Sequence, residues 1–402
     1  MQSPVELNQD SYGVLLVSAQ IDRWQHNQVF ANEIAAAFNA RGVRMKQVDY
    51  LKDVRLLSQC YVDQHCKFFV CFNGFGSELS LASGLHLVSA FEHYRKPLLD
   101  LMHDCPVHET MDHQVDSTSD SRKLFLTDYN YAFLARMLGI RNTRFVPSIT
   151  FPVALGERPL KRFEDRTIDV LLPIGVSNAD EVKGRHSFAG TYKDRVYKQV
   201  FESVVDVAVA DLRVDPLIET MVALQAIHSS VNFANREITF LISSILDYVK
   251  FKRREELIDA VKHLPITLVT DRELSPDLAG TELRVAPNSS FAGLLETMTN
   301  SRTVICPLPH HTGFHERAMG AFSAGAYVIS APNEVLETNF GHDREMHVYR
   351  NVSELASTLE AVIAGTKDLE PVAQAGRARA EERFSPNNLV GAMLTTLALD
   401  AA

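Results

Sequence analysis

One segment in the C-terminal part of the chain combines residue types that suit an anionic ligand. Residues 307–333 read PLPHHTGFHERAMGAFSAGAYVISAPN, which is typical of a strand end, a loop, a helix, a glycine turn and a second strand. Gly313 lets the backbone approach a ligand closely, and we expect the helix to begin near Phe314. Because the first amides and the dipole of a helix favour an anion, this segment predicts a diphosphate site.

Charged and polar side chains gather where this helix should begin. Arg317 lies in the first turn, where the helix dipole disfavours a cation, and a bound phosphate accounts for its position. His310, His311 and His315 lie just before it. The alternative is that these are solvated residues of a loop and a helix start, without a ligand.

A second polar cluster follows an apolar run in the first part of the chain. The segment Leu98–His113 reads LLDLMHDCPVHETMDH. A histidine or an aspartate at the end of a strand can take a proton from a hydroxyl group if its reach and its pKa are suitable. His103 and Asp104 are therefore the candidate general bases, and Asp22, His26 and Glu78 are next in line.

Two other interpretations of this cluster stay open. Asp104 has the residue type that caps a turn before Pro106, which would make the segment a polar loop only. Its histidines and carboxylates also suit a metal, but their spacing matches no compact helical pair and Pro106 interrupts any helix. We therefore predict no metal here.

Composition limits the classes of function. The chain has 402 residues, enough for two domains, and 46% of them are hydrophobic. The formal net charge of −10 argues against a partner such as nucleic acid or an anionic membrane. Five cysteines without C-x-x-C spacing predict reduced thiols in a cytoplasmic protein. We find no signal peptide, no transmembrane run and no motif of P-loop ATPases, zincins or α/β-hydrolases.

Apolar runs that alternate with helical patterns predict a parallel sheet in residues 1–150. A helix is expected at Gln28–Ala40, which ends at Arg41-Gly42. The expected strands are Tyr12–Ala19, Val43–Asp49, Lys67–Phe72, Pro97–Leu101, Lys123–Thr127 and Thr143–Pro147.

A second α/β unit is expected after a linker at residues 151–165. It spans residues 166–385 and contains an unusually long helical segment at 194–263, which is either packing or an oligomer or partner surface. A terminal helix at 386–402 follows. The expected strands are Thr167–Ile174, Ile266–Thr270, Thr303–Cys306 and Ala326–Ser330, and the later helices are Ser353–Ala364, Leu369–Arg383 and Pro386–Leu399. Two Rossmann-like units would place their strand ends across a cleft.

The segment from Arg284 to Leu399 resembles the donor-binding part of the spore-maturation (CgeB-like) glycosyltransferases, which have the GT-B fold. His315-Glu316-Arg317 stands where that family has Asn-Glu-Arg, and Ala321–Gly325 matches its small-residue end. Ala331-Pro332-Asn333 matches its polar turn. The resemblance also likens Gly175 to the glycine that opens the donor site in GT-B second domains. It implies that the donor contacts are Gly175, His311, Gly313, His315, Glu316, Arg317 and Asn333.

The resemblance breaks at one position. The family's second glutamate, often credited with holding the donor ribose, falls on Gly320. The ribose contact must therefore come from another residue such as Glu316, or the donor differs.

The resemblance implies a hexosyltransferase-type enzyme. It would move a sugar from a nucleotide-sugar donor, its co-substrate, to a hydroxyl or amide of a glycan, a protein or a small molecule, without a metal or another cofactor. Two alternatives remain: a GT-B-like nucleotide-sugar epimerase, and a non-catalytic carbohydrate- or partner-binding GT-B protein, which Gly320 favours.

Overall fold

The chain folds into two compact units. The structure, a computed structural model, describes residues 10–22, 24–83, 86–108, 120–156, 160–175, 179, 182, 192–227, 230–270, 278, 280–287, 290–307 and 311–399. Unit 1 comprises residues 1–158, 290–292 and 381–402, and unit 2 comprises residues 159–289 and 293–380. The C-terminal helix, which the sequence left as a separate element, thus groups with unit 1.

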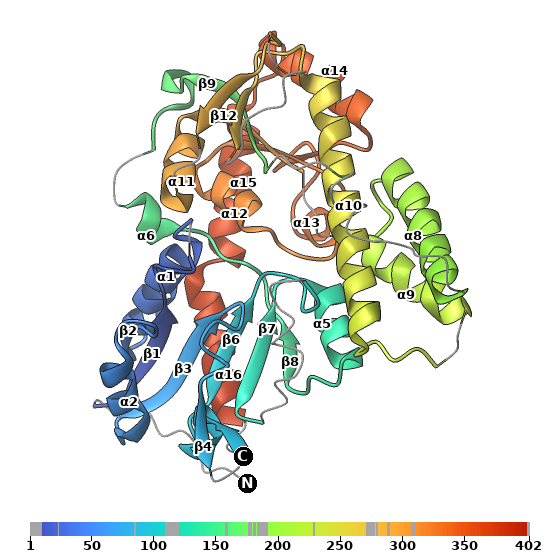
Figure 1. Ribbon diagram of the computed structural model, residues 1–402. Coiled ribbons are helices and arrows are strands. Elements are labelled where there is room, and N and C mark those ends of the chain that lie inside the picture. The colour runs from blue at the N-terminus through green and yellow to red at the C-terminus, as the bar shows by residue number, and fades with distance from the viewer. Residues whose placement is uncertain are drawn as a thin grey trace. The chain divides into compact units, whose positions relative to one another are not determined.

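Unit 1 is built on a parallel six-stranded sheet with the order β2-β1-β3-β6-β7-β8. Its strands are mostly apolar and buried, as expected for a sheet with helices on both faces (Figure 1). The strands are β1 (Tyr12–Val17), β2 (Arg44–Asp49), β3 (Cys66–Phe72), β6 (Leu98–Met102), β7 (Arg122–Leu126) and β8 (Thr143–Phe145). The helices are α1 (His26–Ala40), α2 (Val54–Val62), α3 (Ala90–His93), α5 (Tyr129–Met137), α6 (Pro152–Leu155) and α16 (Pro386–Leu399).

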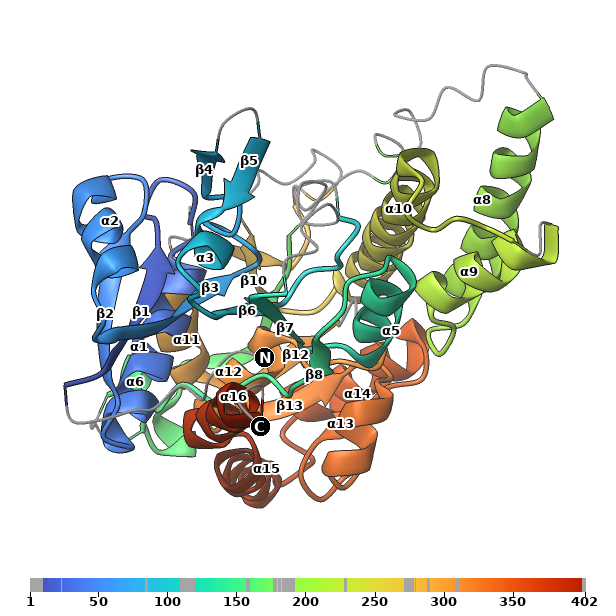
Figure 2. The same cartoon turned by 90° about the horizontal axis from the view of Figure 1, so that it is seen from below.

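Two features of unit 1 depend on contacts between distant parts of the chain. Helix α16 packs along α1, so the last helix completes the first unit (Figure 1). The strands β4 (Ser80–Ser83) and β5 (His86–Ser89) form an antiparallel pair that projects from the unit (Figure 2). Neither strand was expected from the sequence.

Unit 2 has its own parallel six-stranded sheet, with the order β11-β10-β9-β12-β13-β14. The strands are β9 (Ile168–Pro173), β10 (Thr267–Thr270), β11 (Arg284–Pro287), β12 (Ser301–Cys306), β13 (Tyr327–Ser330) and β14 (His347–Val348). Its helices are α8 (Tyr192–Ala210), α9 (Pro216–Ile227), α10 (Arg236–Val261), α11 (Phe291–Thr299), α12 (Glu316–Ser323), α13 (Glu334–Asn339), α14 (Val352–Ile363) and α15 (Glu370–Arg383). The sequence missed β11 and β14, which are the two edge strands.

The long helical segment of unit 2 resolves into α8, α9 and α10. Helix α10 has 26 residues and begins where the Asn235 side chain accepts the Glu237 amide. Its C-terminal half places Leu257 and Val261 in the core of the sheet. Its N-terminal half packs against α8 and α9, and the Phe201 ring of α8 meets the Tyr248 ring of α10 edge-on (Figure 2). Helix α10 therefore joins a small helical layer to the sheet.

The strand orders locate the ligand crevices. The order of unit 1 reverses between β1 and β3, and that of unit 2 reverses between β9 and β12. In open parallel sheets, ligands bind beyond the carboxyl ends of the strands at such reversals. The expectation of two Rossmann-like units is confirmed.

Two further expectations concern the chain as a whole. All five cysteines are buried, and none of them forms a disulfide within the part of the chain that the structure describes. No helix in the described ranges is long and apolar enough to cross a membrane.

Candidate functional site

The predicted anion site lies where α12 begins. Helix α12 begins at Glu316, two residues later than we expected, because His315 has an extended backbone (φ −95°, ψ 137°). The Nδ1 atom of His315 accepts the Arg317 amide at 3.2 Å and so caps the helix. The first turn of α12 still lies beyond β12, as the sequence indicated, but the histidine uses one of its amides.

His315 has two competing partners. Its imidazole is buried, and the same Nδ1 atom lies 3.0 Å from the Glu316 carboxylate. A neutral Nδ1 accepts the backbone amide, whereas a protonated one donates to the carboxylate, so one contact excludes the other. If His315 also contacts the donor, as predicted, its protonation state therefore decides whether it caps the first turn of α12.

Arg317 lies at the strand-order reversal of the second sheet. Its Nη1 donates to the Pro173 carbonyl at the end of β9, at 3.2 Å. Its Nε lies 4.0 Å from Glu316, and 27% of the side chain is exposed. One guanidinium group thus bridges from α12 to β9 and stays accessible to solvent at the crevice.

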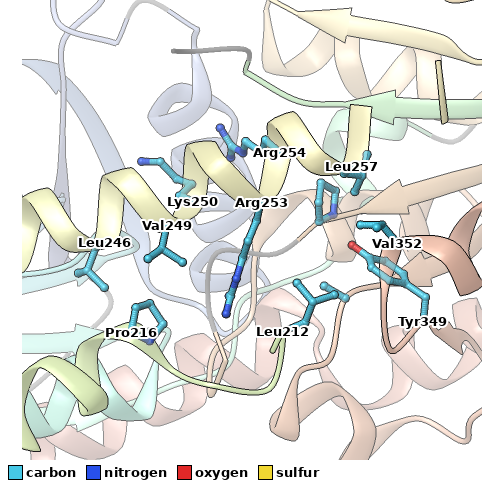
Figure 3. A pocket seen from close by; sticks show the side chains of 12 residues that line it. Leu212, Pro216, Leu246, Val249, Lys250, Arg253, Arg254, Leu257, Tyr349 and Val352 are labelled. Atoms are coloured by element: carbon cyan, nitrogen blue, oxygen red, sulfur yellow. The ribbon is translucent and has the colours of Figure 1, made fainter. Parts of the chain in front are cut away.

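A pocket opens beside these strand ends. Its empty volume is about 540 Å³, part of it open to solvent. Helix α10 provides one wall, and the ends of β12, β13 and β14 provide another (Figure 3). The lining residues are Leu212, Pro216, Leu246, Val249, Lys250, Arg253, Arg254, Leu257, Pro307, Ala331, Tyr349 and Val352.

Sequence reasoning missed the cations on α10. Lys250, Arg253 and Arg254 line the pocket, and their spacing of three and four residues is the signal that places them near one helical face. Arg254 donates from Nη1 to the carbonyl of Gly175 at 3.0 Å. Gly175 was predicted to open the donor site, and its carbonyl faces α10.

Arg253 builds the pocket wall. It donates to the carbonyl of Ala208 in the last turn of α8 at 2.9 Å, and to those of Asp211 and Val214, which lie between α8 and α9, at 3.0 Å each. Its Nη1 lies 2.9 Å from the Nε2 of His311, which must accept because arginine can only donate. Burial lowers the pKa of Arg253 to about 10, so it remains charged at neutral pH. His311 therefore contacts the pocket wall through its hydrogen bond from Arg253.

Asn333 positions the loop that contains Gly313. Its side chain is almost fully buried, and its Nδ2 donates to the Gly313 carbonyl at 2.8 Å. Its Oδ1 accepts the Leu336 amide at 2.8 Å and caps α13. Both ends of this amide thus contact the protein, and Asn333 fixes the backbone that approaches the predicted diphosphate.

The departure from the family at Gly320 has a packing explanation. A Cβ atom at this position would lie 2.7 Å from Cδ2 of Leu295 on α11. Helices α11 and α12 therefore touch where the family has its second glutamate. A larger side chain at residue 320 would require the Leu295 and Met298 side chains to move.

In unit 1, Asn73 contacts both candidate bases, His103 and Asp104, through its side chain. It follows β3 with a left-handed backbone (φ 49°). Its Oδ1 accepts the His103 amide at 2.8 Å, and its Nδ2 donates to Asp104 Oδ2 at 2.9 Å. His103 is buried, with its ring 4.4 Å from that of Phe30, whereas Asp104 is exposed. Asp104 is thus the more accessible of the two candidate bases.

The alternative bases have other surroundings. The Asp22 carboxylate accepts the amides of His26 at 2.8 Å and Gln28 at 2.9 Å, so it caps the start of α1. Glu78 is exposed. Asp22 also lines a small pocket of about 200 Å³ near the reversal between β1 and β3. Glu109, Asp112 and His113, at the end of the polar cluster Leu98–His113, lie outside the described residues, as does His310.

Comparison with known proteins identifies one matching family. Residues 253–395 match the family model described as "Glycosyl transferase-like". The matched range begins at the arginine that builds the pocket wall and includes α12. This match supports a glycosyltransferase. None of the curated proteins matches the chain by sequence.

Solved structures share the fold over nearly the whole chain. The Anabaena protein Alr3699/HepE in complex with UDP-glucose has a TM-score of 0.53 at 11% identity, covering 96% of this chain and 99% of that one. Sucrose-phosphate synthase from Thermosynechococcus elongatus has a TM-score of 0.52 at 12% identity, covering 98% and 100%. The T4 phage BGT in complex with UDP and Mn²⁺ has a TM-score of 0.53 at 10% identity, covering 96% and 99%. The predicted GT-B fold is thereby confirmed.

Proposed function

We propose that the protein transfers a hexosyl group from a nucleotide-sugar donor to a hydroxyl or amide of an acceptor. The observation that carries this proposal is the position of Arg317. Its guanidinium lies at the strand-order reversal of the second sheet, beside the first turn of α12 and the end of β9. A cation and helix amides at such a crevice form a binding site for the diphosphate of a donor.

The donor site uses the residues of unit 2. The diphosphate lies against the Gly313–Arg317 backbone, and the remainder of the donor occupies the adjacent pocket. As the sugar departs, Arg317 and the amides of α12 offset the charge that develops on the leaving diphosphate, which removes the need for a metal. Two proteins of similar fold support a uridine nucleotide as the first candidate, since HepE was solved with UDP-glucose and BGT with UDP.

The base comes from unit 1. The Asp104 carboxylate accepts the proton of the acceptor hydroxyl, while Asn73 holds it in place through a hydrogen bond of 2.9 Å. His103 supports this strand end from a buried position beside Phe30. Asp104 is the catalytic residue in this scheme and His103 is a positioning residue.

The decisive experiment is calorimetric titration of the full chain with a panel of nucleoside diphosphates and nucleotide sugars. Arg317→Ala removes charge-assisted bonds worth roughly 1.5–3 kcal/mol, so diphosphate affinity should fall about ten- to a hundredfold. Gly313→Val should weaken binding at least as much, because a side chain there separates the backbone from the phosphates. The free nucleoside should bind to Arg317→Ala as it does to the wild type.

Arg302→Ala is the matched control. Arg302 lies on β12 but pairs with Asp169 at 2.9 Å on the surface, so its loss should leave nucleotide affinity unchanged. If the wild type binds no nucleotide or nucleotide sugar at millimolar concentration, or if both site variants bind as tightly as the wild type, the donor site is misplaced. A nucleotide-sugar epimerase would instead convert its donor without any acceptor.

A further inference from the structure

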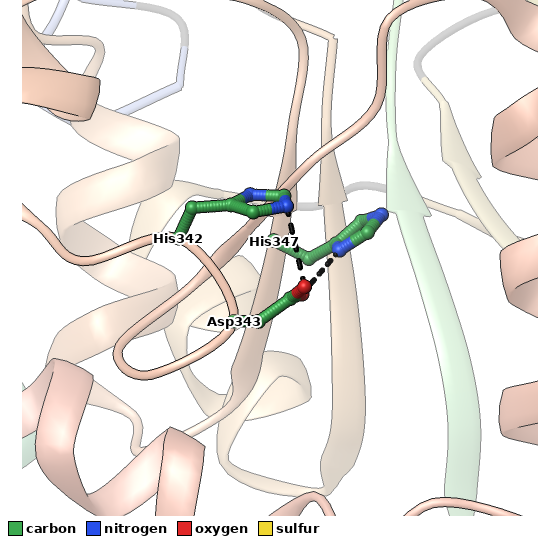
Figure 4. A group of neighbouring side chains, drawn as sticks. All are labelled: His342, Asp343 and His347. Atoms are coloured by element: carbon green, nitrogen blue, oxygen red, sulfur yellow. Dashed lines mark hydrogen bonds and ion pairs between the residues drawn. The ribbon is translucent and has the colours of Figure 1, made fainter.

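A compact group of ligand-type side chains lies in unit 2, in the loop that leads into β14. His342 Nε2 is 3.3 Å from Asp343 Oδ2, and His347 Nδ1 is 2.7 Å from Asp343 Oδ1 (Figure 4). One nitrogen from each histidine and a carboxylate oxygen all lie within 4.8 Å of one another. A metal ion at the centre of such a triangle would be within reach of all three.

We propose that His342, Asp343 and His347 bind a first-row divalent cation of the Zn²⁺ class. Two imidazoles and one carboxylate are the ligand set that borderline-soft ions prefer over Mg²⁺ or Ca²⁺, which favour oxygen ligands. All three residues come from one segment of six residues, 342–347. Three protein ligands leave one position of a tetrahedral ion for water.

The local backbone presents the carboxylate between the two rings. Asp343 has a left-handed backbone (φ 56°), and its amide donates to the Met346 carbonyl at 2.7 Å. The Glu345 carboxylate accepts the Gly341 amide at 2.7 Å and closes the loop from the other side. Hydrogen bonds within the loop thus fix its backbone. The three ligands are held close together by these bonds, and an ion is not needed to order the loop.

His347 is oriented for coordination through Nδ1. Only 7% of its side chain is exposed, and its Nε2 lies 3.4 Å from the Thr358 hydroxyl on α14. In the 2.7 Å contact with the Asp343 carboxylate, Nδ1 carries the proton, because an ionised carboxylate only accepts. On coordination this proton moves to Nε2, where the Thr358 hydroxyl can accept it, and the Nδ1 lone pair then binds the ion. Partners of this kind fix the tautomer and the ring direction of metal-binding histidines.

His342 has to exchange one contact to bind the ion. Its Nδ1 accepts the Val348 amide at 3.2 Å, which places its proton on Nε2, the nitrogen that faces Asp343. Coordination through Nε2 moves the proton to Nδ1 and gives up the Val348 bond. Because 51% of the side chain is exposed, the ring has room to turn. The exposure also gives the ion a path from solvent.

This site is separate from the proposed transfer chemistry. His342 and Asp343 precede β14 and His347 is its first residue, and none of the three lines the pocket. The ion would therefore hold the loop at residues 342–346 to the first residue of β14 and stabilise the unit without touching the proposed donor pocket. Its binding can be measured whether or not the protein transfers sugar.

The test is calorimetric titration of the full chain with ZnCl₂ after EDTA treatment and buffer exchange. We expect one Zn²⁺ per chain and a higher melting temperature in its presence, because an ion that binds only the folded state stabilises it. His342→Ala and Asp343→Asn should each weaken binding at least tenfold. Thr358→Val, which changes only the partner of His347, should weaken it roughly 10–100-fold. Asparagine tolerates the left-handed backbone of Asp343, so that variant should fold normally.

His263→Ala is the matched control. His263 is half exposed and lies 3.6 Å from Glu360, a histidine–carboxylate pair that, among the described residues, belongs to no three-ligand group. Its loss should leave Zn²⁺ affinity unchanged. The proposal is overturned if the wild type binds no Zn²⁺ at micromolar concentration. It is also overturned if His342→Ala and Asp343→Asn, shown to be folded by circular dichroism, bind as well as the wild type.

Discussion

Two arginines of unit 2 show how one residue type serves two purposes. Arg253 directs its donors to three carbonyls and to His311, so its charge is used to hold the chain together. Arg317 donates to the Pro173 carbonyl, lies 4.0 Å from Glu316 and keeps 27% of its side chain exposed. Accessibility, rather than charge, is what makes Arg317 the candidate for a ligand contact.

The same reasoning separates the two candidate bases of unit 1. We expect Asp104→Asn to lower kcat on the order of 10²–10⁴-fold with little change in donor affinity, since the amide cannot accept the proton. Asn73 can still hydrogen-bond to the new side chain, so the fold should be preserved. His103→Ala should also lower kcat, by disturbing the strand end on which Asp104 sits. The measurement is steady-state kinetics with saturating donor.

Near-wild-type turnover in both variants would place the base elsewhere, and Asp22, His26 and Glu78 would be tested next.

At the scale of elements, a buried carboxylate connects α1 with α6. Glu33 on α1 is 1% exposed and accepts the amides of Val153 at 3.1 Å and Ala154 at 2.8 Å. Burial raises the pKa of Glu33 from 4.5 to about 7, although the two hydrogen bonds act in the opposite direction. The Glu33 carboxylate accepts hydrogen bonds from amides in the first turn of α6. Its burial removes a negative charge from water, which is unfavourable.

This raised pKa predicts a pH-dependent stability. Because the folded pKa lies above the unfolded one, the stabilising contribution of protonated Glu33 is complete below pH 4.5 and is lost as the pH rises towards about 7. Glu33→Gln does not titrate. The unfolding free energy of the wild type, relative to that of the variant, should therefore fall by roughly 3 kcal/mol across this range.

Urea unfolding of both proteins at several pH values between 4 and 8 makes the measurement. Histidines that titrate in the same range contribute equally to both proteins and cancel in the difference. A difference that stays constant with pH would show that Glu33 ionises at its ordinary pKa, and that its two amide bonds balance the effect of burial.

At the scale of the whole molecule, the two units have parallel sheets of the same size but different strand orders. The sheet of unit 2 has the order of dinucleotide-binding folds, with β9 and β12 at the reversal, whereas unit 1 reverses between β1 and β3. Unit 2 contains the larger of the two pockets described above, at about 540 Å³ against 200 Å³. The division agrees with a donor site in unit 2.

The proposed mechanism makes a prediction about metals at this scale. Sugar transfer should survive EDTA, and Mg²⁺ or Mn²⁺ should not raise the rate, because Arg317 and the amides of α12 stabilise the leaving diphosphate. Zn²⁺ should raise the melting temperature and leave kcat unchanged. Assays with and without EDTA, followed by addition of each ion, provide the measurement. A complete loss of activity that Mn²⁺ or Mg²⁺ restores would contradict the metal-free mechanism.

The sequence by itself determined the features that depend on neighbouring residues. Apolar runs such as those of β1 and β3 predict buried strands, because in a sheet that is covered on both faces the alternating side chains are all apolar. The loop and helix at 307–323 were also predicted from local residue types, as was the adjacency of His103 and Asp104. The edge strands β11 and β14 were missed because strands of four and two residues leave too short a pattern.

Only the tertiary structure decided the relations between distant residues. Arg253 meets His311 across 58 positions, and Arg254 meets Gly175 across 79, so no local period indicates that α10 forms the pocket wall. The carbonyl of Phe384 accepts the Thr150 amide across 234 positions, which joins the C-terminal segment to unit 1. The physical reason is that side-chain periodicity reports which face of an element is buried, whereas the partner it is buried against is selected by packing of the complete chain.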